Sequence, residues 1–131
     1  MKAVKAREIL FSAANEIGKL QEIVKMIKDA GVNIRAVSAW AVKDEAFFRL
    51  ITSDNAKTKE VLQGSFAVEE REVVIVYMPD EVGKLESLTN KLKDNNININ
   101  HIYGTTSEPG KTAMIIFSSD NNDKAQEVIS E

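Results

Sequence analysis

Two short segments, Asn15-Glu16-Ile17-Gly18 and Asp80-Glu81-Val82-Gly83, place polar residues and a glycine directly before an expected helix. A helix N-terminus presents backbone N–H groups without intrahelical partners and a partial positive charge. A carboxylate can therefore bind there without a basic side chain. Because glycine has no Cβ, a ligand can also approach the backbone closely at Gly18 and Gly83. Both segments are candidate binding sites for a carboxylate.

Both segments also have purely structural interpretations. The side chains of Asn15 and Asp80 are of the type that accepts from N–H groups of the first helical turn, so they would act as helix N-caps without any ligand. Gly18 and Gly83 would equally permit tight packing of a helix against a sheet. Since Asp80 and Glu81 are both acidic whereas Asn15 is neutral, equal affinities at the two sites are not expected.

The chain offers few groups for catalysis or metal binding. Its 131 residues include no cysteine and one histidine, which excludes thiolate chemistry, disulfides and any His-pair metal site within one chain. That histidine, His101, lies on an expected strand with Ile99 and Tyr103 on its face, which favours a packing or surface role. No nucleophile–base pair can be recognised. We therefore expect no catalytic residue, no metal and no cofactor.

The charge distribution argues against nucleic-acid binding. The net charge of −3 combines 11 basic and 8 acidic residues in 1–65 with 6 basic and 12 acidic residues in 66–131. Neither half has the strongly basic surface that binding to phosphates requires. No apolar run approaches the roughly 18 residues of a membrane span, and none resembles a signal-peptide core. The absence of cysteine fits a cytoplasmic protein, which is the expected location.

The two segments belong to an internal repeat with an offset of 65 residues. Asn15–Leu20 aligns with Asp80–Leu85, and Lys28–Ile34 aligns with Lys93–Ile99. Farther on, at an offset of 66, Ser53-Asp54-Asn55 aligns with Ser119-Asp120-Asn121. One extra residue is therefore expected between these blocks, in the loop 107–111. Since the repeat spans most of the sequence, the chain is predicted to be a duplicated unit.

Each half predicts the same series of elements. Apolar runs and helical spacing predict strands at 7–13, 33–42, 46–52, 66–71, 73–78, 97–104 and 112–117. Helices are expected after the N-cap candidates Asn15 and Asp80 and after Asp54 and Asp120. The stripe of Leu20, Ile23, Val24 and Ile27 recurs as Leu85, Leu88 and Leu92. Gly31 and Asn96 occupy equivalent positions after these helices, where a left-handed residue ends a helix. Asp54 and Asp120 are expected to cap the second helix of each half.

These elements predict an α+β fold of two ferredoxin-like βαββαβ units. The expected domains are residues 1–71 and 72–131, joined near Glu70–Glu72 by a very short linker. The second unit lacks its last strand, which leaves the apolar strand 73–78 as a sheet edge prone to aggregation. We expect that edge to be covered by the N-terminal segment or by another chain.

In order, spacing and duplication, these segments resemble small stand-alone proteins of two tandem ACT domains. The resemblance rests on Asn15–Leu20, Asp80–Leu85 and the strand entries at Ala30–Ile34 and Asn96–Ile99, and it covers about residues 4–130. Such proteins sense small ligands, usually amino acids. The chain departs from their pattern at Ile17 and Val82, where such loops commonly carry proline.

The resemblance implies a non-catalytic regulatory protein that binds an amino acid where the loop of one ACT unit meets the second strand of its neighbour. A homodimer, and possible contact with a metabolic enzyme or regulator, follow from the same resemblance. Backbone groups would hold the α-carboxylate, while Asn15, Asp80 or Glu81 would take the α-ammonium. The implied ligand-binding residues are Asn15, Glu16, Ile17, Gly18, Val37, Ser38, Ala39, Asp80, Glu81, Val82, Gly83, Ile102, Tyr103 and Gly104.

Three other functions fit the sequence less well. An interaction-only regulatory subunit with degenerate pockets is the main alternative, because both loop prolines are missing. RNA-recognition modules share the βαββαβ topology, but the strands 47–51 and 114–117 lack their Gly/aromatic/basic signature. Acylphosphatases also share it, yet neither loop carries the arginine that binds phosphate in those enzymes. Trp40 would line a pocket or, more commonly for a lone aromatic residue, serve packing or an interface.

Overall fold

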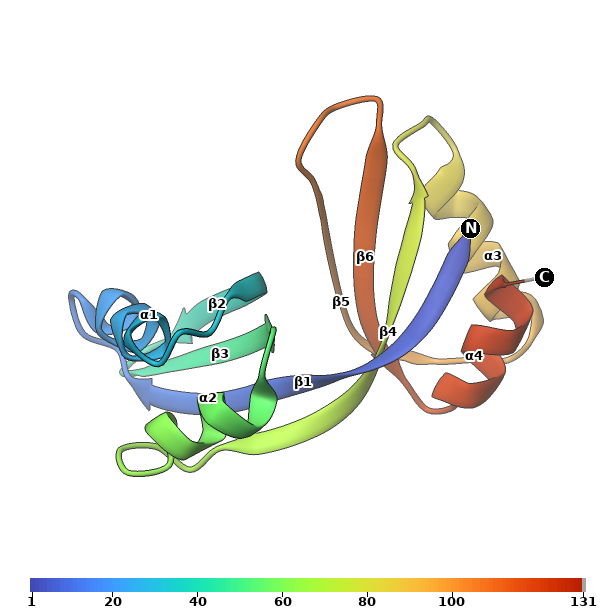
Figure 1. Ribbon diagram of the computed structural model, residues 1–131. Coiled ribbons are helices and arrows are strands. Elements are labelled where there is room, and N and C mark those ends of the chain that lie inside the picture. The colour runs from blue at the N-terminus through green and yellow to red at the C-terminus, as the bar shows by residue number, and fades with distance from the viewer. Residues whose placement is uncertain (131) are drawn as a thin grey trace. The chain divides into compact units, whose positions relative to one another are not determined.

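The computed structural model describes residues 1–130, which form six strands and four helices (Figure 1). In chain order the elements are β1 (Lys2–Ala14), α1 (Lys19–Asp29), β2 (Ile34–Val42), β3 (Glu45–Thr52), α2 (Asn55–Leu62), β4 (Glu69–Pro79), α3 (Lys84–Asp94), β5 (Ile99–Thr106), β6 (Thr112–Ser119) and α4 (Asn122–Ile129).

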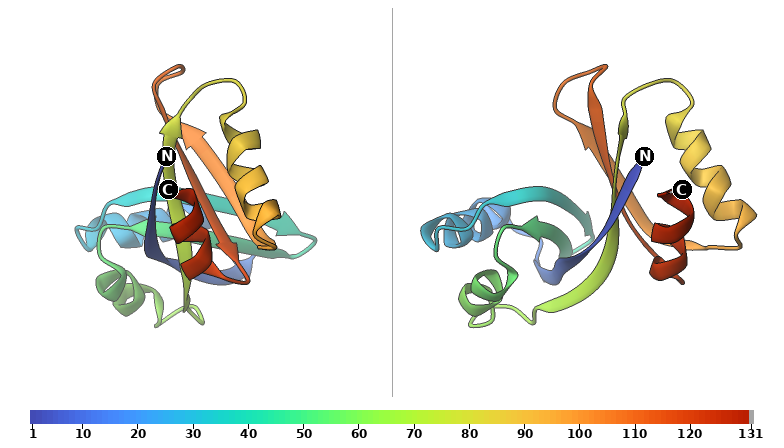
Figure 2. Two further views of the ribbon diagram at one scale, coloured as in Figure 1. Left: turned by 90° about the vertical axis from the view of Figure 1, so that its right-hand side faces the viewer. Right: turned by 45° about the vertical axis from the view of Figure 1, so that its right-hand side comes forward.

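The chain forms two compact units that do not divide it at a single point. The first unit is Arg7–Arg71, and the second combines Met1–Ala6 with the chain from Glu72 onward. The strand order is β2-β3-β1-β4 in the first unit and β1-β4-β6-β5 in the second, so β1 and β4 each contribute to both. In each unit both helices lie on one face of the strands (Figure 2). This is the expected pair of ferredoxin-like units.

Alternating residues of each sheet build the two cores. In the first unit, Ile9 and Phe11 of β1 pack with Phe48 and Leu50 of β3 against the buried side chains of the helices. The expected stripe of α1 is only partly buried, because Ile23 and Ile27 are enclosed while Leu20 and Val24 remain exposed. The second unit repeats this arrangement, with Leu88 and Leu92 buried and Leu85 exposed.

The N-terminal segment supplies the strand that the second half lacks. Residues Lys2–Ala6 of β1 lie beside β4 within the second unit, and Ala3 is buried in that unit's core with 5% of its surface exposed. The expectation that the N-terminal segment covers this edge is confirmed. The first strand therefore begins at Lys2 rather than near Arg7, and residues 1–6 pack with the second half, whereas the sequence analysis assigned them to the first.

Strand β4 is also longer and more continuous than expected. It runs without a break from Glu69 to Pro79, so no linker separates the predicted strands 66–71 and 73–78. The segment before Glu69 is not part of the strand, and Phe66 instead donates its N–H to Leu62 at the end of α2. Both β1 and β4 therefore run without a break from one unit into the other.

The repeat contains two extra residues in the second half, not one. Strand β3 begins at Glu45 and β6 at Thr112, and the helices after them begin at Asn55 and Asn122, an offset of 67 in each case. The insertion lies in the β5–β6 hairpin, as expected, but the predicted length of one residue is wrong. The alignment of Asp54 with Asp120 was therefore also wrong.

The corrected offset explains the helix caps. Asp54 accepts from the Lys57 N–H as predicted, whereas the cap of α4 is Asn121, which accepts from the Lys124 N–H. Asp120 instead accepts from the Asn98 N–H. The left-handed residues after α1 and α3, Gly31 with φ 76° and Asn96 with φ 56°, are as expected.

The strand that completes each unit, which we call the closing strand, is residues 69–71 of β4 in the first unit and residues 2–6 of β1 in the second. Ion pairs hold both closing strands, through an acidic residue in the first and a basic residue in the second. In the first unit Glu70 binds Arg7 at 2.8 Å and Lys59 at 3.0 Å. These two cations hold the pKa of the Glu70 carboxyl below its usual value of 4.5, the Arg7 hydrogen bond acting most strongly. In the second unit the equivalent residue, Lys5, pairs with Asp123 and lies 4.0 Å from Glu72, and Asp123 raises the pKa of Lys5.

The buried position of Ala3 predicts a large effect of charge on stability. Ala3→Asp should lower the free energy of unfolding by about 2–3 kcal/mol, because it places an unpaired carboxylate in the core. The matched control Lys2→Asp, at an exposed position of the same strand, should change it by less than about 0.5 kcal/mol. Urea unfolding measures both values, and equal effects would contradict the role of this strand in the second core.

The ion pairs of Glu70 predict a pH-dependent contribution to stability. A lowered folded-state pKa means that stabilisation is present above the unfolded pKa and is lost as pH falls through the folded one. Glu70→Gln should therefore destabilise the protein by about 1 kcal/mol at neutral pH and progressively less on acidification. Denaturant unfolding of both proteins from neutral to acidic pH tests this prediction, with Glu69→Gln as the control. A constant difference at every pH would be inconsistent with the ion pairs.

Candidate functional site

The polar residue that opens each candidate loop ties the loop to a hairpin and does not cap the helix. Asn15 donates its N–H to the Asp44 carbonyl at 2.9 Å and its side-chain amide to the Lys43 carbonyl at 3.0 Å. Asp80 donates its N–H to the Lys111 carbonyl at 2.9 Å, and its carboxylate accepts from the Gly110 N–H at 2.8 Å. The predicted N-cap role of Asn15 and Asp80 is wrong.

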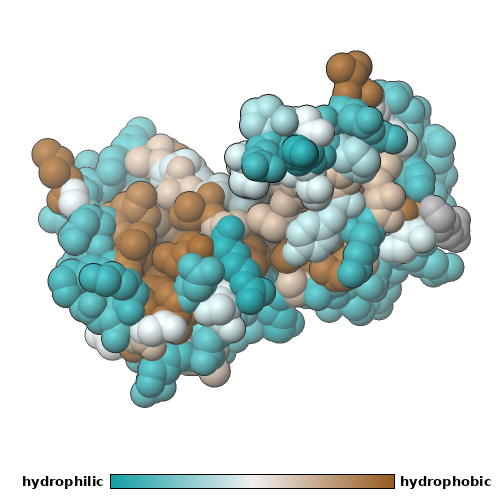
Figure 3. Space-filling model, turned by 45° about the horizontal axis from the view of Figure 1, so that its top comes forward, coloured by the Kyte–Doolittle hydropathy of each residue, from teal (hydrophilic) through white to brown (hydrophobic). Residues whose placement is uncertain are grey.

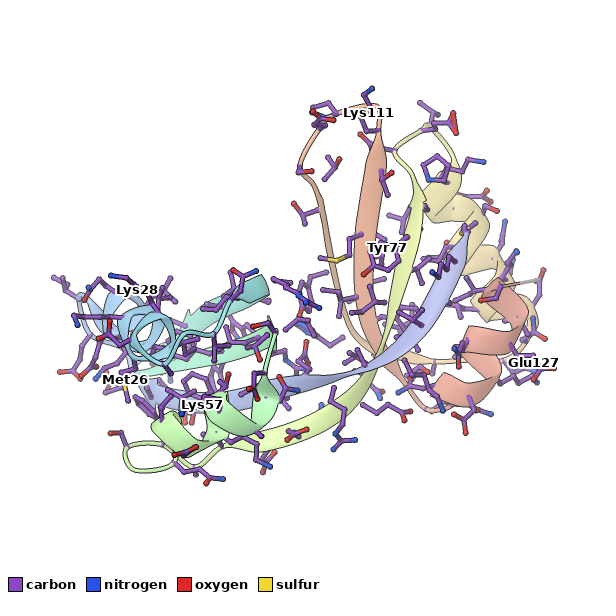
Figure 4. The ribbon with its side chains drawn as sticks, viewed as in Figure 1. Met26, Lys28, Lys57, Tyr77, Lys111 and Glu127 are labelled. Atoms are coloured by element: carbon purple, nitrogen blue, oxygen red, sulfur yellow. The ribbon has the colours of Figure 1, made fainter. Side chains whose placement is uncertain are left out.

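These clamps fix each loop against the β2–β3 or β5–β6 turn. The clamped residues, Lys43 and Gly110, both have positive φ, at 54° and 82°. They are equivalent at the corrected offset of 67, so the same backbone turn is held by an amide donor in one unit and a carboxylate acceptor in the other. Lys111 lies at the tip of the second hairpin (Figure 4).

Gly18 and Gly83 are the N-cap residues of α1 and α3. Both are left-handed, with φ 83° and 88°, and no side chain caps either helix. A Cβ at either position would meet no atom within 4 Å, so the proposed role in tight helix–sheet packing is wrong. Glycine is needed for the backbone conformation, and the space beside the uncapped N–H groups is open.

Lysine follows each N-cap glycine and adds positive charge at the helix N-terminus. Lys19 lies 2.9 Å from Glu22 and 3.6 Å from Glu16, and the hydrogen bond to Glu22 raises its pKa. Lys84 occupies the same place in α3, with Glu81 at 3.9 Å. A cation at this position opposes the helix dipole, so it favours an anion bound there.

In the second unit the loop forms one wall of a cavity of about 260 Å³. Asp80, Glu81 and Lys84 supply the polar groups of this cavity, which we call the loop pocket. The rest of its lining comes from Met78, Pro79, Leu85, Thr105, Thr106, Ala113 and Ile115. The structure therefore brings together charged groups, a helix N-terminus and an apolar floor, as small-molecule sites do.

The loop pocket includes residues that sequence reasoning missed. Strand β5 was expected to end at Gly104 but continues to Thr106, and Thr105 and Thr106 line the pocket. The polar, β-branched pair directly after the expected strand end was the available signal. Val82 and Gly83 lie in the same loop, whereas Ile102 and Tyr103 are not among the lining residues.

The predicted strand residues divide between the two faces of their sheets. Val37 and Ala39 of β2 are register partners of Leu50 and Phe48, which face the helices, so Ser38 between them faces away. In β5, Ile102 and Gly104 are register partners of Phe117 and Ile115, which pack in the core of the second unit, so both lie on the helix side. Tyr103 lies on the other face, where its ring is 5.5 Å from that of His101. One ligand can therefore meet only alternate side chains of each strand.

Gly104 has a steric role beside the loop pocket. A Cβ there would stand 2.4 Å from Ile115 Cδ1 and 3.1 Å from the Met114 carbonyl oxygen. Glycine thus lets the Ile115 side chain lie across β5, where it forms part of the floor of the pocket. Gly104 therefore acts by shaping the pocket.

Apolar side chains protrude from both candidate loops. Ile17 is 107% exposed and Val82 is 105% exposed, more than in an extended reference chain. Figure 3 also shows hydrophobic surface gathered on the first unit. The large apolar residues exposed on that unit are Ile17, Leu20, Val24, Val37, Trp40 and Val42. Apolar surface gathered as in Figure 3 indicates an interaction site.

The comparisons with known families agree with this fold. Residues 5–131 match the family described as ACT domain pair, so the chain belongs to that family. A search of curated proteins gave no match.

Several solved structures share the fold. Protein BT0572 from Bacteroides thetaiotaomicron superposes with a TM-score of 0.89 at 25% identity, covering 97% of this chain and 88% of that one. The ligand-free regulatory subunit of aspartate kinase from Thermus thermophilus gives a TM-score of 0.69 at 11% identity, with 98% and 95% covered. The aspartokinase alpha and beta subunits give 0.64 at 16% identity, also with 98% and 95% covered.

Two further features concern residues 1–130. No helix in this range is both long and apolar enough to cross a membrane. Within the same range, no three His, Asp or Glu side chains converge in a way that would hold a metal ion.

The contact between Gly104 and Ile115 predicts a mutation pair that compensates. Gly104→Ala should destabilise the protein by about 1–3 kcal/mol, because the new methyl group overlaps Ile115 Cδ1. Ile115→Val removes that atom, so Gly104→Ala/Ile115→Val should be clearly less destabilised than the sum of the single variants. A double-mutant cycle by urea unfolding measures this coupling, and strict additivity would contradict the proposed overlap.

Proposed function

We propose that the protein is a non-catalytic regulatory module that binds an amino acid at its candidate loops. The observation that carries the proposal is the loop pocket, where an uncapped helix N-terminus, Lys84 and Glu81 border an apolar floor. The ligand α-carboxylate binds the free N–H groups of α3 beside Lys84. The α-ammonium binds Glu81, because the Asp80 carboxylate is already engaged by Gly110.

We further propose that two copies of the chain complete the site. The apolar side chains at the tips of the two candidate loops, Ile17 in the first unit and Val82 in the second, are fully exposed in a single chain. The edge strands β2 and β5 leave one side without a strand neighbour. An exposed apolar edge such as β2 favours pairing with a partner chain. The loop of one copy then meets the second strand of its neighbour, at Val37 and Ala39 or at Ile102.

Regulation by such a site requires different ligand affinity in two states of the protein. A ligand held between two copies meets this condition, since it binds the assembled state and not the separated chains. The regulated partner, a metabolic enzyme or a regulator, would respond to assembly. The proposed location of this module is the cytoplasm.

A thermal-shift screen against the twenty amino acids tests the proposal. A ligand that binds only the native state raises the melting temperature. At least one amino acid at millimolar concentration should do so, and Gly83→Val should abolish that shift, because a β-branched residue both resists φ of 88° and obstructs the helix N-terminus. Gly64→Ala is the control, since its Cβ meets nothing within 4 Å and its φ is not positive.

If no amino acid shifts the melting temperature, the amino-acid proposal fails and the alternative of an interaction-only regulatory subunit is favoured. The fully exposed apolar tips Ile17 and Val82 fit that alternative as well. A shift that survives Gly83→Val would instead place the ligand elsewhere in the chain.

A further inference from the structure

The first unit has a cavity of about 310 Å³ on the sheet face opposite its helices. Its lining includes Leu10, Ser12, Trp40, Phe47, Arg49 and Glu69, and we call it the sheet pocket. Ser12, Phe47 and Trp40 are register partners across β1, β3 and β2, so they form one row on that face. The candidate loop at residues 15–18 is not part of this lining.

Two aromatic rings stack against each other and give the sheet pocket an apolar, aromatic surface. The rings of Trp40 and Phe47 are nearly parallel, with an interplanar angle of 18° and centroids 5.5 Å apart. The Arg49 guanidinium lies over the Trp40 ring at 5.6 Å, and 38% of Trp40 remains exposed. A planar apolar group gains stacking and burial on such a surface.

Arg49 brings a buried positive charge to the same place. Its side chain is 15% exposed and donates to Glu8 at 3.2 Å, and the Glu8 side chain is 1% exposed. The Arg49 Nε is buried and has no hydrogen-bond partner within residues 1–130. Because a buried donor without a partner loses its hydrogen bonds to water, an acceptor supplied by a ligand would be favoured there.

Glu69 brings a negative charge to the opposite wall. It lines the pocket, and its carboxylate forms no ion pair or hydrogen bond with the described residues. The Arg49–Glu8 pair is neutral overall, so Glu69 gives the pocket a net negative charge. A purely anionic ligand would be repelled, whereas a ligand carrying both charges would match Arg49 and Glu69 separately.

The second unit shows that the fold does not require these residues. At the positions equivalent to Glu8 and Arg49 it has Val73 and Ile116, both buried. At the positions of Phe47 and Trp40 it has Met114 and Thr105, which are also register partners. An apolar pair commonly replaces a buried ion pair without loss of stability. The charged and aromatic set therefore belongs to the first unit's function.

We propose that the sheet pocket binds a small zwitterion with a flat ring. The ring lies on Phe47 and Trp40, the anionic group accepts from Arg49, and the cationic group pairs with Glu69. This site is independent of the loop pocket, so the two proposals can fail separately.

The fluorescence of Trp40 tests the proposal directly, because it is the chain's one tryptophan. L-phenylalanine serves as the probe, since it is a ring-bearing zwitterion that does not emit in the tryptophan range. It should change the Trp40 emission saturably below about 10 mM. 3-Phenylpropionate and phenethylamine, which each lack one charge, should bind at least about tenfold more weakly, as expected for loss of one charged hydrogen bond.

Variants that copy the second unit locate the site. Glu8→Val/Arg49→Ile and Phe47→Met should each weaken the phenylalanine response at least about tenfold while keeping the native circular dichroism spectrum. Tyr77→Phe, on β4 of the second unit (Figure 4), and Gly83→Val, at the loop pocket, should leave it unchanged.

The proposal is overturned if none of the three probes gives a saturable response, or if both pocket variants respond like the unmodified protein. If Glu8→Val/Arg49→Ile does not fold, Phe47→Met alone decides, because it removes the ring without touching the ion pair. A response that disappears in Gly83→Val but persists in Phe47→Met would assign the binding to the loop pocket and reject the sheet pocket.

Discussion

The structure depends on the pairing of β1 with β4, two strands that each pass from one unit into the other. A ferredoxin-like unit needs four strands, and the second half of this chain encodes three after Glu72 besides its two helices. Lys2–Ala6 supply the fourth. The buried Ala3 then occupies in the second unit the place that Val68 takes in the first, 65 residues later in the sequence. The first unit is the single stretch Arg7–Arg71, whereas the core of the second unit depends on residues from the start of the sequence.

Charge as well as hydrogen bonding determines which closing strand belongs to which unit. The closing strand of the first unit carries Glu70 against Arg7, while that of the second carries Lys5 against Glu72. The two pairs occupy equivalent positions with reversed signs. If the closing strands were interchanged, Glu70 would face Glu72 and Lys5 would face Arg7. Like charges directly opposite each other destabilise strand pairing. The reversed signs therefore favour the observed pairing of each closing strand over the interchanged pairing. The same reversal explains part of the charge asymmetry between the halves.

The fold was predictable from the sequence because duplication repeats its signals. Gly31 and Asn96 are different residues that adopt the same left-handed conformation, and their equivalence fixed the alignment of the first helices. The two extra residues of the second hairpin could not be recognised, because Asn121 and Asn122 both match Asn55 in type and only Asn122 matches it in role. The Asn55 side-chain amide donates to the Arg7 carbonyl, and the Asn122 side-chain amide donates to the Glu72 carbonyl. No local sequence pattern reveals these contacts. The loops at 15–18 and 80–83 lie before α1 and α3, as the repeat predicts. The roles of Asn15 and Asp80 were not predictable, because their partners lie about 30 residues away in the sequence. The sheet pocket was missed since Trp40, Phe47 and Arg49 converge only through strand register.

The continuity of β1 has a consequence for how the protein is made. Lys2–Ala6 are synthesised long before the residues with which they pair in the second unit, which begin at Glu72. About 65 residues must be added before that partner exists, which at typical rates of elongation takes several seconds. Arg7–Arg71 can meanwhile assemble around their own core. The nascent chain therefore carries Lys2–Ala6 as a short strand without its partner until the second half emerges, and that strand is available to any chaperone or neighbouring nascent chain that reaches it first.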